Sequence, residues 1–213
     1  MSSSGIVSLY YRYLTHLKKR KKFVAPLQLT GRIEDYLVHE FIGYAYQESG
    51  GRLLGKSNLG GRDQQKYDIA FVKGVSPDSE RIVALVEAKY LRNAHRTSSD
   101  DNARDETLTT LKDLGRQLHR FGGLKHGGIP VELLSRNKEV YGLVFASYSK
   151  PVKIEDKKEA FYKDVKRKAK GIGFRFLDYE TPQLNSVYED VKVPALGTIY
   201  RVSLRTGLWR SRQ

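Results

Sequence analysis

The pattern of apolar and polar positions along this chain predicts helices alternating with strands. Apolar residues recur every three to four positions, as on one face of a helix, at 31–48, 106–121 and 155–170. Alternating or continuous apolar runs, which are typical of strands, occupy 51–55, 66–73, 81–91, 140–148, 174–179 and 197–204. Glycines follow each helical segment, at 50–51, 122–123 and 171, where helices commonly end.

The order of these elements predicts an α/β fold with a mixed β-sheet flanked by helices. The turn-rich segment 74–80 joins strands 66–73 and 81–91 as a hairpin, and the helix at 106–121 then crosses to the strand at 140–148. The continuous apolarity of 81–91 is typical of a central strand. We expect a basic N-terminal segment at 1–29, a core domain at 30–148, and a basic C-terminal extension at 149–213 packed on that domain.

Composition adds a strong positive charge to this picture. Lys and Arg number 38 against 24 Asp and Glu, a formal net charge of +14, which favours a polyanionic partner such as nucleic acid. A basic solvated surface or an anionic membrane surface is the alternative interpretation. The chain has no Cys, which excludes disulfides, thiolate zinc sites and thiolate-held iron–sulfur clusters.

The N-terminus and the hydropathy favour an intracellular protein. The N-terminus places its charges after its apolar residues, the reverse of a secretory signal, and no apolar run reaches the length of a membrane span. We therefore expect a cytoplasmic protein without membrane contact, associated with the nucleoid in a bacterium or working in the host cell if the chain is viral.

The central strand carries two charges near its end. Glu87 and Lys89 are two positions apart, so their side chains project to the same face. A buried charge without a partner costs several kcal/mol, and Asp68 on the preceding strand is the obvious second carboxylate. Antiparallel pairing could place Asp68 beside Glu87, although the sequence leaves the register open. Two adjacent carboxylates repel unless a cation joins them or one is protonated, and oxygen ligands without Cys favour Mg²⁺, for which Mn²⁺ can substitute.

The first helix supplies a further acid. Glu34 falls inside the apolar arc formed by Ile33, Leu37 and Phe41, which is unusual for a carboxylate. Each acid also has a simpler interpretation. Glu34 could be an exposed first-turn residue favoured by the helix dipole. Asp68 could be a strand-edge acid paired with Lys66 or Arg62. Glu87 and Lys89 could lie at a strand end that reaches water.

Taken together, the helix with Glu34, the hairpin with Asp68 and the run Glu87-Ala88-Lys89 resemble the PD-(D/E)XK nuclease superfamily. The resemblance covers about residues 30–148, and Tyr67 stands where the motif is named for Pro. It implies a restriction-endonuclease-like core of helix, three strands, helix and strand (αβββαβ). It also implies that Asp68, Glu87 and the Ala88 backbone carbonyl hold the metal. Lys89 would orient the attacking water and stabilise the transition state, and Glu34 would serve a second ion.

The function that the resemblance implies is a Mg²⁺-dependent DNA endonuclease of restriction type, a hydrolase that cuts double-stranded DNA as a homodimer. A structure-specific nuclease, such as a junction resolvase or a phage or viral replication nuclease, is the first alternative. A non-catalytic nucleic-acid-binding module on a nuclease fold is the second. The residues expected to contact DNA are basic apart from one glutamine, whose position is occupied by Gln in some branches of the superfamily: Lys18, Lys19, Arg92, Arg96, Gln117, Lys163, Lys166 and Arg167.

Overall fold

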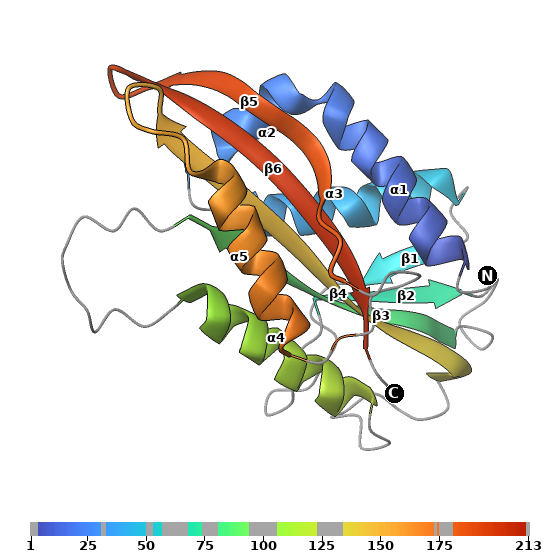
Figure 1. The fold of residues 1–213 in the computed structure, drawn as a ribbon. Coiled ribbons are helices and arrows are strands. Elements are labelled where there is room, and N and C mark those ends of the chain that lie inside the picture. Colours follow the sequence, from blue (N-terminus) through green and yellow to red (C-terminus); the bar gives the residue numbers. More distant parts are fainter. Residues whose placement is uncertain are drawn as a thin grey trace.

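A six-stranded mixed sheet forms the centre of the protein. The structure is a computed structural model, and it describes residues 4–30, 33–49, 53–56, 68–73, 81–93, 106–122, 134–172, 174 and 181–211. The elements in chain order are α1 (Ser4–Lys19), α2 (Lys21–Leu27), α3 (Ile33–Glu48), β1 (Leu53–Lys56), β2 (Ile69–Lys73), β3 (Arg81–Arg92), α4 (Glu106–Gly122), β4 (Leu134–Pro151), α5 (Lys158–Lys170), β5 (Asn185–Ala195) and β6 (Thr198–Arg210) (Figure 1).

The sheet is mixed because one strand pair is parallel. The strand order is β1-β2-β3-β4-β6-β5, with β3 and β4 parallel and every other neighbouring pair antiparallel. α4 supplies the crossover that a parallel pair requires. The expectation of an α/β fold with a mixed sheet between helices is therefore confirmed.

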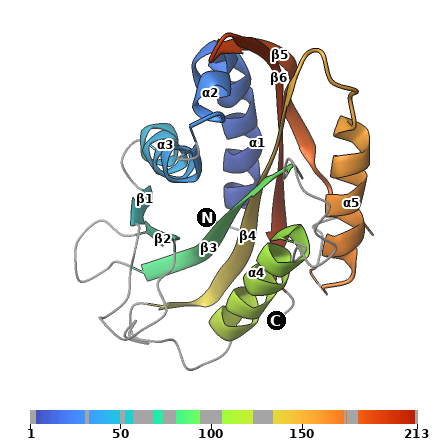
Figure 2. The same ribbon diagram turned by 90° about the vertical axis from the view of Figure 1, so that its left-hand side faces the viewer.

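The helices cover both faces of the sheet. Figure 2 shows α1, α2 and α3 on one side, and α4 and α5 on the other. Each side has its own core: one cluster joins the first three helices to one set of strand residues, and the other joins α4 and α5 to the alternate set. Because both faces are covered, the strands of the centre are apolar on both sides, which explains the continuous apolar run of β3.

The helices at 31–48, 106–121 and 155–170 are confirmed as α3, α4 and α5, and five of the predicted strands correspond to β1, β2, β3, β4 and β6. Residues 66–67, the turn at 74–80 and most of the loop after β3 lie outside the described residues. The strand expected at 174–179 is wrong at Phe174, which belongs to no strand and packs its ring against Trp209. Residues 175–179 lie outside the described residues.

β5 was not predicted, and its irregular pairing explains why. Its register against β6 shifts twice, between Ser186 and Tyr188 and again between Tyr188 and Val191, and Asp190 has a positive φ of 52°. These bulges break the strict alternation of buried and exposed residues by which a strand is recognised in a sequence.

The described part of the N-terminal segment, residues 4–29, contributes to the core. Residues of α1 spaced at helical intervals are buried on the sheet, among them Ile6, Leu9, Tyr13 and Leu17. The expectation of a separate basic segment at 1–29 took account of its charges and not of this helical spacing. No described helix combines the length and the apolarity needed to cross a membrane.

A buried hydrogen bond links α1 to strand β6 of the sheet. The hydroxyl groups of Tyr10 and of Thr206 on β6 lie 2.7 Å apart. We expect Tyr10→Phe to lower the free energy of unfolding by about 1–2 kcal/mol, because Thr206 loses its buried partner. Urea unfolding measures the change. The matched control is Tyr46→Phe, since Tyr46 is 49% exposed. Equal stability of the two variants would contradict a structural role for α1.

Candidate functional site

The site is built on a stretch of β3 that has no neighbouring strand on one side. β2 pairs with β3 only as far as Ile69 opposite Val86, whereas β3 continues to Arg92. Beyond Val86, no strand of the described chain pairs with β3 on the β2 side. Unpaired backbone groups at such an edge need other partners.

Two carboxylates lie beside those backbone groups. The N–H of Ala88 donates to Asp68 Oδ2 at 2.8 Å, and the carboxylate of Glu34 lies near enough to the backbone N–H of Tyr90 to offset part of the rise that burial causes in its pKa. Because Asp68 directly precedes Ile69, continuing the register of the hairpin places it opposite Glu87. The sequence left the register of the β2–β3 hairpin open, and in the structure this register brings Asp68, Glu87 and Lys89 together. Glu34 on α3 lies on the other face of the sheet.

Glu87 is a buried carboxylate with one free oxygen. Its side chain is nearly inaccessible, and Oε1 accepts a hydrogen bond from Lys89 Nζ at 2.5 Å. Oε2 is buried without a hydrogen-bond partner among the described residues. Burial raises the pKa of Glu87 to about 7, and the charge of Asp68 raises it as well, although Lys89 opposes both. Glu87 is therefore held in a site where its own negative charge is disfavoured.

The pKa values of Lys89 and Glu34 are also shifted by burial and by the neighbouring charges. Burial lowers the pKa of Lys89, but the carboxylates of Glu87, Asp68 and Glu34 outweigh this effect and leave the pKa raised. Burial raises the pKa of Glu34, an effect that Asp68 increases and Lys89 reduces. Each group thus feels the charges of its neighbours, so these side chains form one electrostatic cluster rather than separate surface charges.

A glycine beside Glu87 lets α4 cover the site. Gly142 on β4 is the register partner of Glu87. A Cβ added at Gly142 would lie 3.1 Å from methyl groups of Leu114 and of Leu118 on α4. The helix therefore approaches the sheet closely at this position, which contributes to the burial of Glu87. A glycine inside an apolar strand is a recognised sign of such an approach, and the sequence analysis passed over it.

Substituting Gly142 tests this close approach. We expect Gly142→Val to lower the free energy of unfolding by about 1–2 kcal/mol, because the added methyl groups push against Leu114 and Leu118. Thermal unfolding measures the change. The contrasting control is Gly43→Ala in α3, where an added Cβ meets nothing within 4 Å. This control is expected to gain up to about 1 kcal/mol from helix propensity. A stable Gly142→Val variant would show that α4 is not tightly packed there.

The cluster fits a divalent cation in its chemistry. Three carboxylates and one ammonium leave an excess of negative charge, and the free Oε2 of Glu87 lacks the partner that a buried oxygen requires. Ala88 donates its N–H toward β2, so its carbonyl points to the same side, because both groups of a strand residue face one neighbour. Within the described residues, however, no group of three or more acidic or His side chains lies close enough together to hold a metal ion.

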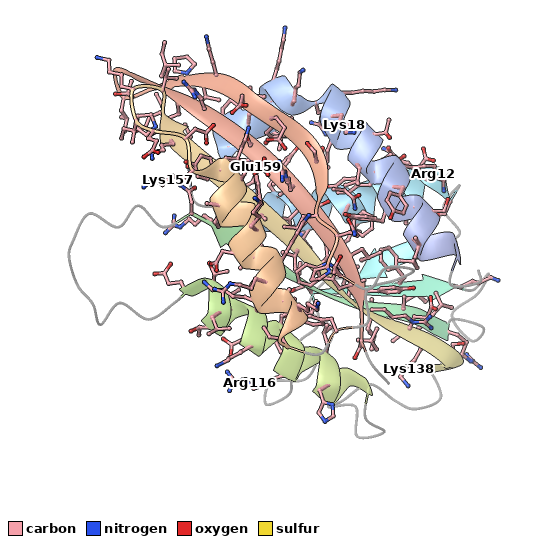
Figure 3. All side chains as sticks on the ribbon, in the orientation of Figure 1. Arg12, Lys18, Arg116, Lys138, Lys157 and Glu159 are labelled. Carbon is pink, nitrogen blue, oxygen red and sulfur yellow. The ribbon has the colours of Figure 1, made fainter. Side chains whose placement is uncertain are left out.

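The expected DNA-contacting residues are spread over the molecule. Lys18 and Lys19 are exposed in the last turn of α1, on the opposite side of the sheet from α5, which carries Lys163, Lys166 and Arg167. Figure 3 shows Arg12 and Lys18 on α1, Arg116 on α4 and Lys157 beside α5, at separate parts of the surface. The structure therefore does not bring these two basic groups together.

Two of the remaining candidates lie nearer to the site. Arg92 ends β3, three positions after Lys89, and is exposed. Gln117 is half-buried on α4, with its Oε1 buried and without a partner among the described residues. Gly115 faces Ile172 beyond α5, so Gln117, about 200° further around the helix, faces away from α5. Arg96 lies outside the described residues.

Comparison of the chain with protein-family models, with curated proteins and with solved structures found no match. The functional interpretation therefore depends on the residues of the site and on their geometry.

Proposed function

We propose that this protein is a Mg²⁺-dependent DNA endonuclease that hydrolyses phosphodiester bonds. The observation that carries the proposal is the gathering of Glu34, Asp68, Glu87 and Lys89 at the open edge of β3. The order α3, β1, β2, β3, α4, β4 supports it, since a restriction-endonuclease-like core has the order αβββαβ. The net charge of +14 supports a polyanionic substrate.

In this proposal Asp68 and Glu87 hold the cation, with the Ala88 carbonyl as a further oxygen ligand. Glu87 Oε2 is the oxygen available for this purpose, because Oε1 already accepts from Lys89. The chemistry that a bound divalent cation supplies is a lower pKa for water and neutralisation of charge on the scissile phosphate. Glu34 contributes a further carboxylate, for a second ion or for water around the first.

Lys89 has the role of the positive group in the proposed site. Its ammonium carries three donors and now gives one to Glu87, so the others are available to a phosphate oxygen or to the attacking water. A fixed cation aimed at the charge that develops in the transition state lowers the barrier more than a mobile one does. The surrounding carboxylates keep Lys89 protonated, because they raise its pKa.

A cleavage assay tests this function directly. Purified protein is incubated with supercoiled plasmid, a four-way junction or single strands, each with Mg²⁺ or with EDTA. The expected result is cleavage that requires the metal. Discrete plasmid fragments would favour a restriction-type enzyme acting as a homodimer, and cleavage confined to the junction would favour a resolvase. Binding without metal-dependent cleavage of any substrate would overturn the proposal in favour of a non-catalytic binding module.

A further inference from the structure

A pocket with both polar and apolar lining lies next to the proposed catalytic site. Its volume is about 480 Å³, within the range of pockets that hold small organic ligands. The walls come from the end of α2, the ends of β3 and β4, the β5–β6 turn and the start of β6. The residues on which the argument depends are Gln28, Tyr90, Arg92, Ser147, Ser149 and Tyr200.

The pocket and the catalytic cluster share Tyr90. Its backbone N–H lies near the carboxylate of Glu34, whereas its side chain lines the pocket. The side chain of Lys89 projects to the opposite face of β3, because successive strand residues alternate. Since β3 has no neighbouring strand on this side among the described residues, the two faces meet at its open edge. A chain bound at that edge can therefore occupy both places at once.

The polar groups behind the pocket are already hydrogen-bonded, so its wall is preformed. Ser147 Oγ donates to Gln28 Oε1 at 2.6 Å, and the Gln28 amide donates to Tyr188. The backbone N–H and carbonyl of Ser149 are both bonded to Asn93, at 2.8 and 2.9 Å. A fixed wall binds a ligand without a further cost of ordering it.

The polar side chains left for a ligand are those of Tyr200, Arg92 and Glu106. The Tyr90 hydroxyl oxygen is buried behind the wall, where burial raises its pKa and nearby Ser147 offsets part of the rise, so it is not open to a ligand. Tyr200 is only partly buried, and Arg92 is exposed. An aromatic ring and a cation together suit a nucleotide, which has a flat base and a phosphate.

We propose that this pocket holds one unpaired nucleotide of the DNA strand whose phosphate lies at Asp68, Glu87 and Lys89. The inference rests on the proposed function, and it narrows the substrate class to DNA with an unpaired nucleotide beside the cut. The base stacks on Tyr200, and Arg92 contacts the adjoining phosphate. A base within an intact duplex is stacked and paired, so it cannot enter the pocket without being extruded.

Binding in EDTA tests the pocket without cleavage. We expect Tyr200→Ala to weaken binding of a short single-stranded oligonucleotide about tenfold, because one stacking contact is lost. Binding of an intact duplex of the same sequence is expected to stay unchanged. Tyr200→Phe keeps the ring and is expected to bind like the wild type. Ile199→Ala is the matched control, since Ile199 neighbours Tyr200 and is 52% exposed.

A second variant tests the pocket independently, in case Tyr200→Ala does not fold. Ser149→Leu adds volume inside the pocket and keeps the backbone bonds to Asn93, so we expect it to weaken single-strand binding in the same way. If the wild type cleaves DNA and both variants bind single strands normally, the proposal for the pocket is wrong and the proposed nuclease function is supported. If the wild type cleaves no DNA but both variants bind single strands more weakly, the proposal for the pocket is supported and the proposed nuclease function is wrong.

Discussion

Asp68→Asn is expected to lower Mg²⁺-dependent DNA cleavage by at least about a hundredfold, the usual loss when one fixed electrostatic contact in a catalytic site is removed. Asparagine keeps an oxygen in the place of Asp68 Oδ2, so the bond from the Ala88 N–H can persist. The substitution therefore removes a charge while leaving the hairpin intact. Initial rates of plasmid cleavage, measured over a range of Mg²⁺ concentrations, give the effect.

The Asp68→Asn substitution is expected to lower the rate of cleavage and not the affinity for DNA. Removing a negative charge from a site that receives a phosphate leaves DNA binding in EDTA equal or tighter. Asp113→Asn is the matched control: Asp113 forms a surface ion pair with Arg116 on α4, away from the open edge of β3. Cleavage by Asp68→Asn at the rate of this control would contradict the catalytic assignment of Asp68.

The second large effect is expected in stability, and it needs no substrate. Burial and Asp68 raise the pKa of Glu87 from 4.5 to about 7, so the folded state binds a proton more tightly than the unfolded chain does. Stability from this group is complete below about pH 4.5 and is lost as the pH rises toward 7. Glu87→Gln removes this titration. Without metal, the stability of the variant relative to the wild type should rise by up to about 3 kcal/mol between pH 5 and pH 8.

Urea unfolding in EDTA at the two pH values measures this difference. Mg²⁺ should reverse the order, because an ion that binds only the folded wild type stabilises it by about 2.7 kcal/mol at a hundred times its dissociation constant. The Glu87→Gln variant should gain much less from Mg²⁺. Parallel stability–pH profiles for the two proteins would show that the pKa of Glu87 is not raised in the folded state. Equal stabilisation of both by Mg²⁺ would remove Glu87 from the metal site.

Together, these results would separate two properties of the same cluster. A site that holds like charges close together is unfavourable for folding and favourable for binding a cation, since the ion offsets the repulsion that destabilises the empty cluster. A structural ion pair between Glu87 and Lys89 would show the opposite behaviour, because removing one partner of a buried pair is destabilising at every pH at which both are charged.

The sequence by itself determined the principal elements and the chemistry of the candidate residues. Helical spacing identified α3, α4 and α5, and the alternation along β3 placed Glu87 and Lys89 on one face, because side-chain direction follows directly from local backbone geometry. The same local reasoning missed β5, where bulges interrupt the alternation, and it missed the role of α1 in the core. The nuclease function and its metal stay predictions.

Only the tertiary structure decided how these residues meet. The register of the hairpin and the early end of β2 leave the edge of β3 open, and that edge is what brings Asp68 and Glu34 to the same backbone. The pocket depends on contacts such as that between Gln28 and Ser147, which are 119 positions apart. Periodicity reports the direction of each side chain from its own strand or helix, but it carries no information about which distant segment packs beside it.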